Sequence, residues 1–147
     1  MRVQILSVLA VLALSINVSA EQYLCIADGA TGFKYDETKK TWNEASFKIQ
    51  DAKYVISSPD NAAATHAYRV MKLGESTPTA TCEQDFNDPG YLFCSGQLGT
   101  ADFRFNRKNG RYLLSFFHGY YSVLPESKTP EAMSDTPFIE IGKCSPF

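Results

Sequence analysis

Short runs in which apolar and polar residues alternate, separated by clusters of Gly, Pro, Asn and Asp, fill the chain from residue 22 onward. Such alternation is typical of half-buried β-strands, and turns about every eight to twelve residues are typical of a sandwich or barrel. We therefore expect an all-β fold, a single antiparallel β-barrel or sandwich of about eight to ten strands. The expected strands are 22–26, 33–35, a return strand from Trp42, 47–49, 54–56, 68–73, 80–84, 91–95, 103–105, 111–118 and 138–143.

Three segments lie outside this alternation. Residues 28–32 are rich in turn formers and predict a break between the first two strands. Asp60 precedes three alanines at 62–64, which are good helix formers, so we expect at most one short helix near residues 60–66. Residues 124–137 carry three prolines among mostly polar side chains, which predicts a long surface loop.

Residues 91–121 carry the clearest pattern in the chain. Asn109-Gly110 stands between two alternating apolar runs, and this pair predicts a tight hairpin turn in which both residues adopt positive φ. In the strand before the turn, Phe103 and Phe105 fall on one face and Arg104 on the other. We expect this ribbon to form the centre of the fold.

Residues 1–20 predict a secretory signal peptide. Arg2 gives a positive start, residues 3–18 are mostly apolar, and Val18-Ser19-Ala20 has the small residues of a cleavage site. The apolar run is shorter than the roughly 20 residues of a membrane-spanning helix, and no stop-transfer charges follow it. We expect residues 21–147 to form a single disulfide-stabilised β domain, exported to the periplasm or outside the cell, with no membrane insertion after signal cleavage.

Composition and charge narrow the partners. The chain has 147 residues with 14 Lys and Arg against 16 Asp and Glu, and loss of Arg2 with the signal peptide leaves a net charge of −3. A negative balance argues against nucleic acid or an anionic membrane as the partner. The 8 Tyr, 10 Phe and 1 Trp all follow residue 20, and this aromatic content favours strands.

The chain has four cysteines: Cys25, Cys82, Cys94 and Cys144. An even number in an exported chain predicts two disulfides, for which three connectivities are possible. No two cysteines stand two to four residues apart, and neither histidine has ligand spacing to a cysteine, so we expect no metal site. We expect no cofactor.

An internal repeat selects one connectivity. The two copies are Tyr23-Leu24-Cys25, Phe33-Lys34-Tyr35-Asp36 and Trp42, then Tyr91-Leu92-Phe93-Cys94, Phe103-Arg104-Phe105-Asn106 and Tyr112. Convergence of two aromatic-rich hairpins would also give this likeness. If it reflects pseudo-symmetry, both copies turn two aromatics inward and the Lys or Arg outward. Cys82 then pairs with Cys94 across the turn near Asp88, and Cys25 pairs with Cys144 where a closed structure joins its first and last strands.

One set of motifs spans most of the chain after residue 20: Tyr23-Leu24-Cys25, Thr31-Gly32-Phe33, Trp42, Phe103-Arg104-Phe105-Asn106, Gly119-Tyr120, Thr136-Pro137 and Ile141-Gly142-Lys143-Cys144-Ser145-Pro146. In these motifs the chain resembles a family of small exported bacterial proteins of uncharacterised function. The resemblance implies export and brings no activity with it. The opening Tyr-x-Cys strand also resembles that of small periplasmic β-barrel lysozyme inhibitors. Length and later motifs depart from that group, so this second likeness serves only as an analogy.

No catalytic signature is present. Nucleophilic catalysis needs a Ser, Cys or Thr beside a base, and the chain has no Gly-x-Ser-x-Gly elbow and no cysteine expected to be free. His118 could act as a general base oriented by Asp102 or Glu140. A strand-end histidine that bonds a backbone carbonyl is the simpler interpretation. We assign no catalytic residue and favour a protein that is not an enzyme.

Binding is the function that these patterns favour. His118, Tyr120 and Tyr121 form an aromatic segment with a glycine, and Arg104 and Arg111 contribute to a concentration of basic residues on the two hairpins. That concentration is either a face for an acidic partner or an ordinary soluble surface. We predict an exported small binding protein of unknown ligand, binding another protein in the periplasm. The alternatives are a small hydrolase or ligand-handling barrel that uses His118, and a structural envelope protein.

Overall fold

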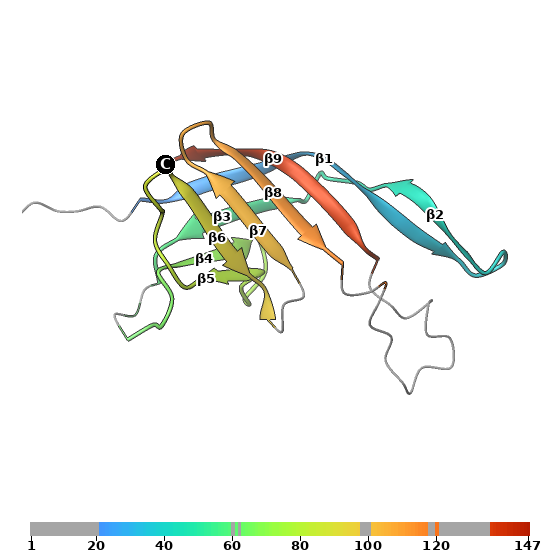
Figure 1. The fold of residues 1–147 in the computed structure, drawn as a ribbon, viewed down its shortest axis with the longest axis horizontal. Helices are drawn as coiled ribbons and strands as arrows, with labels where there is room; N and C mark the ends of the chain where they lie inside the picture. Colours follow the sequence, from blue (N-terminus) through green and yellow to red (C-terminus); the bar gives the residue numbers. More distant parts are fainter. Residues whose placement is uncertain (1–20, 60, 62, 98–100, 118–119, 121–135) are drawn as a thin grey trace, which may run out of the picture.

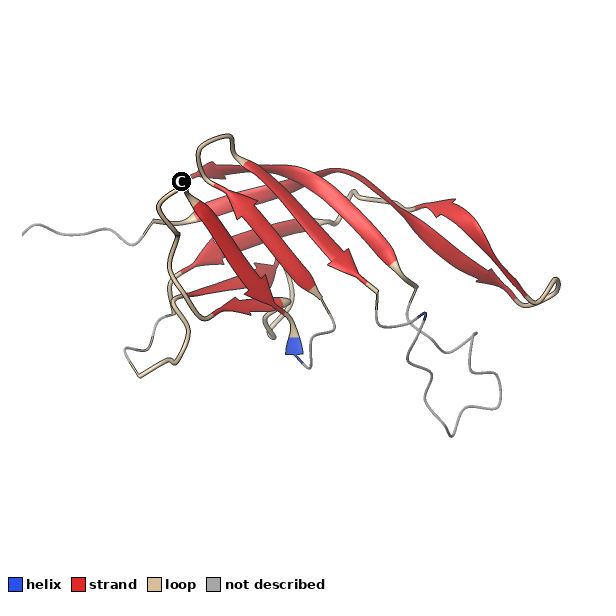
Figure 2. Cartoon of the chain, viewed as in Figure 1, coloured by secondary structure: helices blue, strands red, loops and turns tan. Residues whose placement is uncertain are grey.

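The computed structural model describes residues 21–59, 61, 63–97, 101–117, 120 and 136–147 (Figure 1). Strands and loops make up nearly all of this part of the chain, in which only the single residues Gln97 and Tyr120 have helical backbone (Figure 2). The strands are β1 (Tyr23–Asp36), β2 (Thr41–Ser46), β3 (Lys53–Ser57), β4 (Tyr68–Lys72), β5 (Ala80–Cys82), β6 (Tyr91–Ser95), β7 (Asp102–Asn106), β8 (Arg111–Phe116) and β9 (Phe138–Pro146).

Eight of the nine strands form a closed antiparallel barrel. The hydrogen-bonded order runs from β1 through β3, β4, β5, β6, β7 and β8 to β9, and β9 pairs with β1 again. The remaining strand, β2, pairs only with the C-terminal part of β1, residues 31–36. Closure removes the exposed sheet edges that would otherwise invite aggregation. The expected all-β barrel is confirmed.

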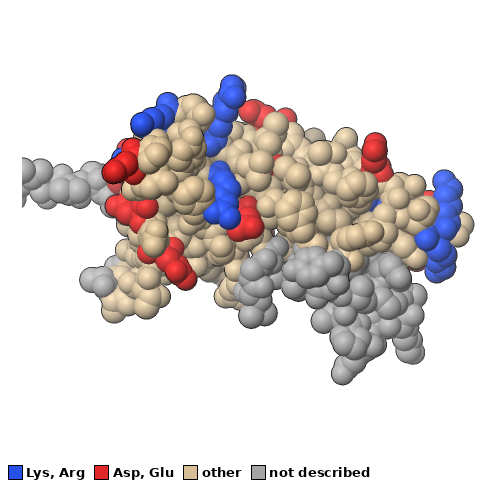
Figure 3. All heavy atoms as spheres, in the orientation of Figure 1, with Lys and Arg blue, Asp and Glu red and all other residues tan. Residues whose placement is uncertain are grey.

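The interior of the barrel is filled by the inward side chains of alternate strand positions. Ile56, Val70, Leu92, Phe103 and Phe105 are all at most 1% exposed. The Phe103 ring stacks on the ring of Tyr112, with centroids 5.0 Å apart. Charged side chains are scattered over the outer surface in Figure 3, as the alternation predicts.

The first strand is longer than predicted. Residues 28–32 were expected to break it, but β1 continues through them with a register shift between Ala27 and Gly29. A bulge of this kind bends a strand without ending it. The beginning of β1 pairs with β3 and its end with β2, so the β1–β2 hairpin extends beyond the barrel (Figure 1).

The two copies of the internal repeat share register but differ in burial. Tyr35 pairs with Trp42 in the first hairpin, and Phe105 pairs with Tyr112 in the second. In the second hairpin, Phe103, Phe105 and Tyr112 point into the core. In the first, Phe33 is 49% exposed, so the prediction that its aromatics face inward is wrong. The reason is the position of the hairpin, which extends beyond the barrel and so lies outside the packed interior.

The turn at Asn109-Gly110 is wider than the predicted tight turn. Asn106 pairs with Arg111, which leaves four residues in the loop, and in this turn only Gly110 has positive φ, at 68°. The Asn106 side chain accepts a hydrogen bond from the Lys108 amide at 2.9 Å. This side-chain bond starts the turn at Asn106, four residues before Gly110, and so overrides the two-residue pattern.

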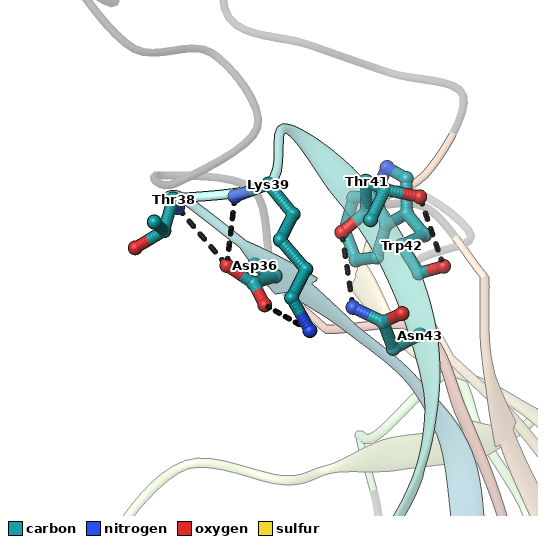
Figure 4. A network of polar contacts seen from close by, with 6 residues as sticks. All are labelled: Asp36, Thr38, Lys39, Thr41, Trp42 and Asn43. Carbon is teal, nitrogen blue, oxygen red and sulfur yellow. Dashed lines mark hydrogen bonds and ion pairs between the residues drawn. The ribbon is translucent and has the colours of Figure 1, made fainter.

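The β1–β2 turn has the same construction. Asp36 Oδ1 accepts hydrogen bonds from the amides of Thr38 and Lys39, each at 3.0 Å, and Lys40 takes the positive φ, at 56° (Figure 4). The Lys39 ammonium lies 3.8 Å from the Asp36 carboxylate. Asp36 and Asn106, which begin the two hairpin turns, therefore have the same structural role.

Both predicted disulfides are present. Cys25 of β1 lies directly opposite Cys144 of β9 and is bonded to it, and Cys82 of β5 is bonded to Cys94 of β6. No cysteine is free. The first bond joins the strands that close the barrel. Two disulfides are compatible with an oxidising compartment.

Some expected element boundaries are wrong. Residues 47–49 form a loop rather than a strand, because the Ile49 carbonyl accepts a turn hydrogen bond from the Ala52 amide at 3.0 Å. The described residues near 60–66 form turns, which agrees with the expectation of at most one short helix, and the side chain of Asn61 accepts a hydrogen bond from the Ala63 amide. Asp60, Ala62 and residues 124–135 lie outside the described residues, so the helix cap and most of the long loop stay predictions.

Candidate functional site

The predicted binding residues fall in different parts of the chain. Arg104 and Arg111 are exposed on the outer face of the barrel, on β7 and β8. Tyr120 is 62% exposed. His118 and Tyr121 lie outside the described residues, so their predicted roles stay predictions. The structure therefore places two of the five predicted residues on one surface.

That surface carries large apolar side chains that face outward. Phe93, Arg104, Leu113 and Ile141 occupy successive paired positions across β6, β7, β8 and β9. Phe93 is 50%, Leu113 38% and Ile141 53% exposed. Contiguous exposed apolar side chains on neighbouring strands are typical of an interaction site. We call the following set the outer patch: Tyr91, Phe93, Leu113, Ile141, Arg104, Arg111 and Lys143.

The aromatic and basic members of the outer patch hold one another in place. The rings of Tyr91 and Phe93 stack with centroids 6.3 Å apart, and the Arg104 guanidinium lies 4.9 Å from the centre of the Phe93 ring. Arg104 also pairs with Asp102 at 3.2 Å. These contacts keep flat groups at the surface, which lowers the entropy lost when a partner covers them.

Two cations of the outer patch remain uncompensated. Arg111 and Lys143 pair across β8 and β9, and neither forms an ion pair with another residue in the described ranges. They border a shallow hollow of about 610 Å³ whose lining includes Leu113 and Ile141. Over β6–β9, Figure 3 shows a mostly uncharged surface that carries separate basic groups, one of them beside an acidic group. The outer patch is thus apolar at its centre and positive along one side.

Tyr120 lies at a separate apolar groove beside the projecting hairpin. Its ring meets the Trp42 ring edge-on, with centroids 5.6 Å apart. Phe33, Phe117 and Pro137 complete the lining of this groove, which encloses about 530 Å³. The predicted residues Tyr120 and Arg104 therefore do not share one site.

A third feature is a cavity at the barrel mouth, the end from which the β1–β2 hairpin projects. Its volume is about 970 Å³. The lining includes Tyr54 of β3, Lys72 of β4, Phe116 of β8, and Phe138 and Glu140 of β9. The other lining residues are Ala30 of β1, the loop residues Phe47, Lys48, Gln50, Asp51 and Ala52 between β2 and β3, and Glu75 and Thr136.

Glu140 is the one buried charged residue in the described part of the chain, with 4% of its surface exposed. The Tyr112 hydroxyl donates a hydrogen bond to Oε1 at 2.8 Å, and the Tyr54 hydroxyl donates to Oε2 at 3.4 Å. Burial raises the pKa of Glu140, while the two hydroxyls and the charge of Lys72 offset part of this effect. Burial, together with Glu140, raises the pKa of both tyrosines, so the hydroxyls remain donors.

Both the outer patch and Glu140 depart from the usual alternation of apolar residues inside and polar residues outside. In β9 the alternation is inverted, because Ile139 and Ile141 face outward and Glu140 faces inward. An apolar residue on the solvent side and a charged residue on the core side each oppose the usual pattern. From the sequence, Glu140 was expected only as a possible partner of His118, and Phe93, Leu113 and Ile141 were not expected at the surface.

Comparison with protein-family models, with curated proteins and with solved structures found no match to this chain. Among the residues that the structure describes, no group of three or more His, Cys, Asp or Glu side chains could hold a metal ion. Within the same residues, none of the helices is long and apolar enough to cross a membrane.

Proposed function

We propose that this chain is an exported protein whose outer patch binds another protein in the periplasm. The observation that carries the proposal is the row of Phe93, Leu113 and Ile141, which are exposed on β6, β8 and β9 with Arg104 of β7 between the first two. Beside this row, Arg111 and Lys143 form no ion pair within the described residues. Soluble monomers rarely leave such a row uncovered without a use for it. The predicted signal peptide and the two disulfides support the location.

The chemistry of the outer patch defines the partner that would fit it. Tyr, Phe and Arg are enriched at protein interfaces, where buried aromatic anchors carry much of the binding energy. Arg111 and Lys143 lie at one side of the apolar centre and would meet carboxylates at the rim. The partner is therefore a protein surface with an apolar centre bordered by Asp or Glu. Its association rate should fall with salt, because rim charges act mainly on the encounter step.

The other two hypotheses have no comparable support. The hydrolase hypothesis depends on His118, which lies outside the described residues, so it stays a prediction. A purely structural envelope protein rests on the disulfides alone, and it gives no reason for exposed aromatics on the outer sheet face.

Site-specific photocrosslinking tests the proposal. A photoreactive phenylalanine analogue replaces Leu113 in the exported protein, and a control protein carries it at Met71 on the outer side of β4. We expect a discrete crosslinked product from the envelope fraction only with the probe at 113. Adding Arg111→Glu and Lys143→Glu to the protein with the probe at position 113 should reduce the yield of crosslinked product about tenfold or more. Lys34→Glu, with the probe at 113, controls for a charge reversal away from the outer patch.

Two results would overturn this proposal. One is equal crosslinking from positions 113 and 71. The other is a product that contains only a second copy of this chain, since the proposal requires a different protein as partner. Once the partner is identified, calorimetry on the purified proteins at low and high salt should rank the affinities of the variants in the same order as their crosslinking yields.

A further inference from the structure

The barrel-mouth cavity is large enough for a small organic molecule. Its volume of about 970 Å³ falls near the upper end of the range typical of ligand pockets. The inward rings of Tyr54, Phe116 and Phe138, together with Phe47 from the loop between β2 and β3, give it an aromatic lining. An apolar body could pack against these rings.

Glu140 gives this aromatic cavity a buried carboxylate. Each carboxylate oxygen accepts one hydrogen bond from a tyrosine hydroxyl and retains a further lone pair. No described Lys, Arg or His side chain forms an ion pair with it. The charge of Lys72 lowers the pKa of Glu140, but Lys72 itself pairs with Glu75 at 3.5 Å. The carboxylate is thus held in place by neutral donors and can accept from a ligand.

The balance of charges around the cavity favours a cation. The lining contains two lysines, Lys48 and Lys72, against three carboxylates, Asp51, Glu75 and Glu140, which gives a net charge of −1 when all are ionised. Aromatic faces attract organic cations further through their quadrupoles. A buried carboxylate lowers stability unless it is well compensated, so its presence on the inward side of β9 calls for a use.

We propose that the barrel mouth binds an organic cation whose ammonium group donates hydrogen bonds to Glu140 and whose apolar body packs on the surrounding aromatic rings. This goes beyond the proposed protein-binding function, because the outer patch faces solvent on the outside of the barrel and Glu140 faces its interior. The ligand class is an amine of modest size with an apolar substituent.

Three matched probes test the proposal on the disulfide-bonded chain without its signal peptide. They are 2-phenylethylamine, the neutral 2-phenylethanol and the anionic 3-phenylpropanoate, titrated by NMR and calorimetry. We expect the amine to bind at least about tenfold more tightly than the alcohol, since a hydrogen bond to a charged group contributes roughly that factor or more. The anion should not bind. The Glu140 side-chain carboxyl ¹³C signal should shift toward its ionised value as the amine is added.

Two variants localise the effect. Glu140→Gln retains the shape of the side chain and an acceptor for Tyr112, and it should remove the preference for amine over alcohol. As the matched control, Glu83→Gln removes an exposed carboxylate that does not line this cavity and should change amine affinity by less than about threefold. The inference is overturned if no probe binds, if alcohol and amine bind equally well, or if the Glu140→Gln protein keeps the preference. Since the comparison of probes uses the unaltered protein, it decides the question even if Glu140→Gln fails to fold.

Discussion

Glu140 is the residue at which packing and chemistry conflict. Its neighbours on β9, Ile139 and Ile141, would conventionally face the core, yet they face outward and the carboxyl group faces inward. The hydroxyls of Tyr112 and Tyr54 satisfy the oxygens without neutralising the charge. An interior acid held in this way should make the stability of the barrel depend on pH.

The pH dependence has a definite sign. Burial raises the pKa of Glu140 above the ordinary glutamate value of about 4.3, so the folded state keeps a proton that the unfolded state has lost. Stability contributed by this site is present below pH 4.3 and is lost as pH rises through the folded pKa. In urea unfolding, the wild-type protein should therefore lose more stability between pH 4 and pH 7 than Glu140→Gln does. Glu75→Gln, which alters an exposed ion pair, should lose as much stability over this pH range as the wild type does. The prediction is contradicted if the difference in unfolding free energy between the wild type and Glu140→Gln is the same at pH 4 and pH 7.

At the scale of elements, the pairing of β1 with β9 depends on close approach of backbones. A Cβ atom at Gly142 would collide with the Ile26 carbonyl and the Tyr112 ring. Gly29, across the same strand pair, has no heavy atom within 4 Å of the position of an added Cβ. The two glycines therefore have different reasons to be small, one steric and the other connected with the bulge in β1.

Alanine substitutions separate these reasons. Gly142→Ala should lower the free energy of unfolding by about 1–3 kcal/mol, because the methyl group overpacks a site next to the Tyr112 ring. Gly29→Ala, the matched control in the same strand pair, should change it by less than about 1 kcal/mol. Chemical denaturation of both variants measures the difference. Equal losses for both would show that backbone freedom, and not steric space, matters at these positions.

At the scale of the whole molecule, the disulfides and barrel closure act together. Cys25–Cys144 joins residues 119 positions apart at the seam between the first and last strands, whereas Cys82–Cys94 spans only 12 positions. In the chain-entropy account, a longer closed loop restricts the unfolded chain more strongly. The seam bond should therefore contribute more to stability than the local one.

Paired alanine substitutions measure this difference. Replacing Cys25 and Cys144 should lower the free energy of unfolding by about 5 kcal/mol, and replacing Cys82 and Cys94 by about 3 kcal/mol. Since small domains are stable by only about 5–15 kcal/mol, the first variant should lose at least about a third of its stability. Circular dichroism during urea titration provides the measurement. A larger loss for the 82/94 variant would contradict the expected dominance of the seam.

The sequence by itself determined the strand-rich fold class, the disulfide pairing and most strand positions. Alternation with period two and the spacing of turns are local properties, and the repeat placed the cysteines on neighbouring strands. It also marked Arg104 and Arg111 as surface cations. The Asn109-Gly110 turn was placed correctly along the chain but given the wrong form, because the Asn106 side chain begins the loop earlier.

Only the tertiary structure decided which residues meet and which similar segments are buried. Phe33 and Phe103 occupy equivalent places in the repeat, yet the first lies on a hairpin outside the barrel and the second in its core. The outer row of Phe93, Leu113 and Ile141 depends on the registers of four strands, and the Glu140 cluster brings together residues as much as 86 positions apart. Such contacts follow from the closure of the barrel, which no local pattern specifies.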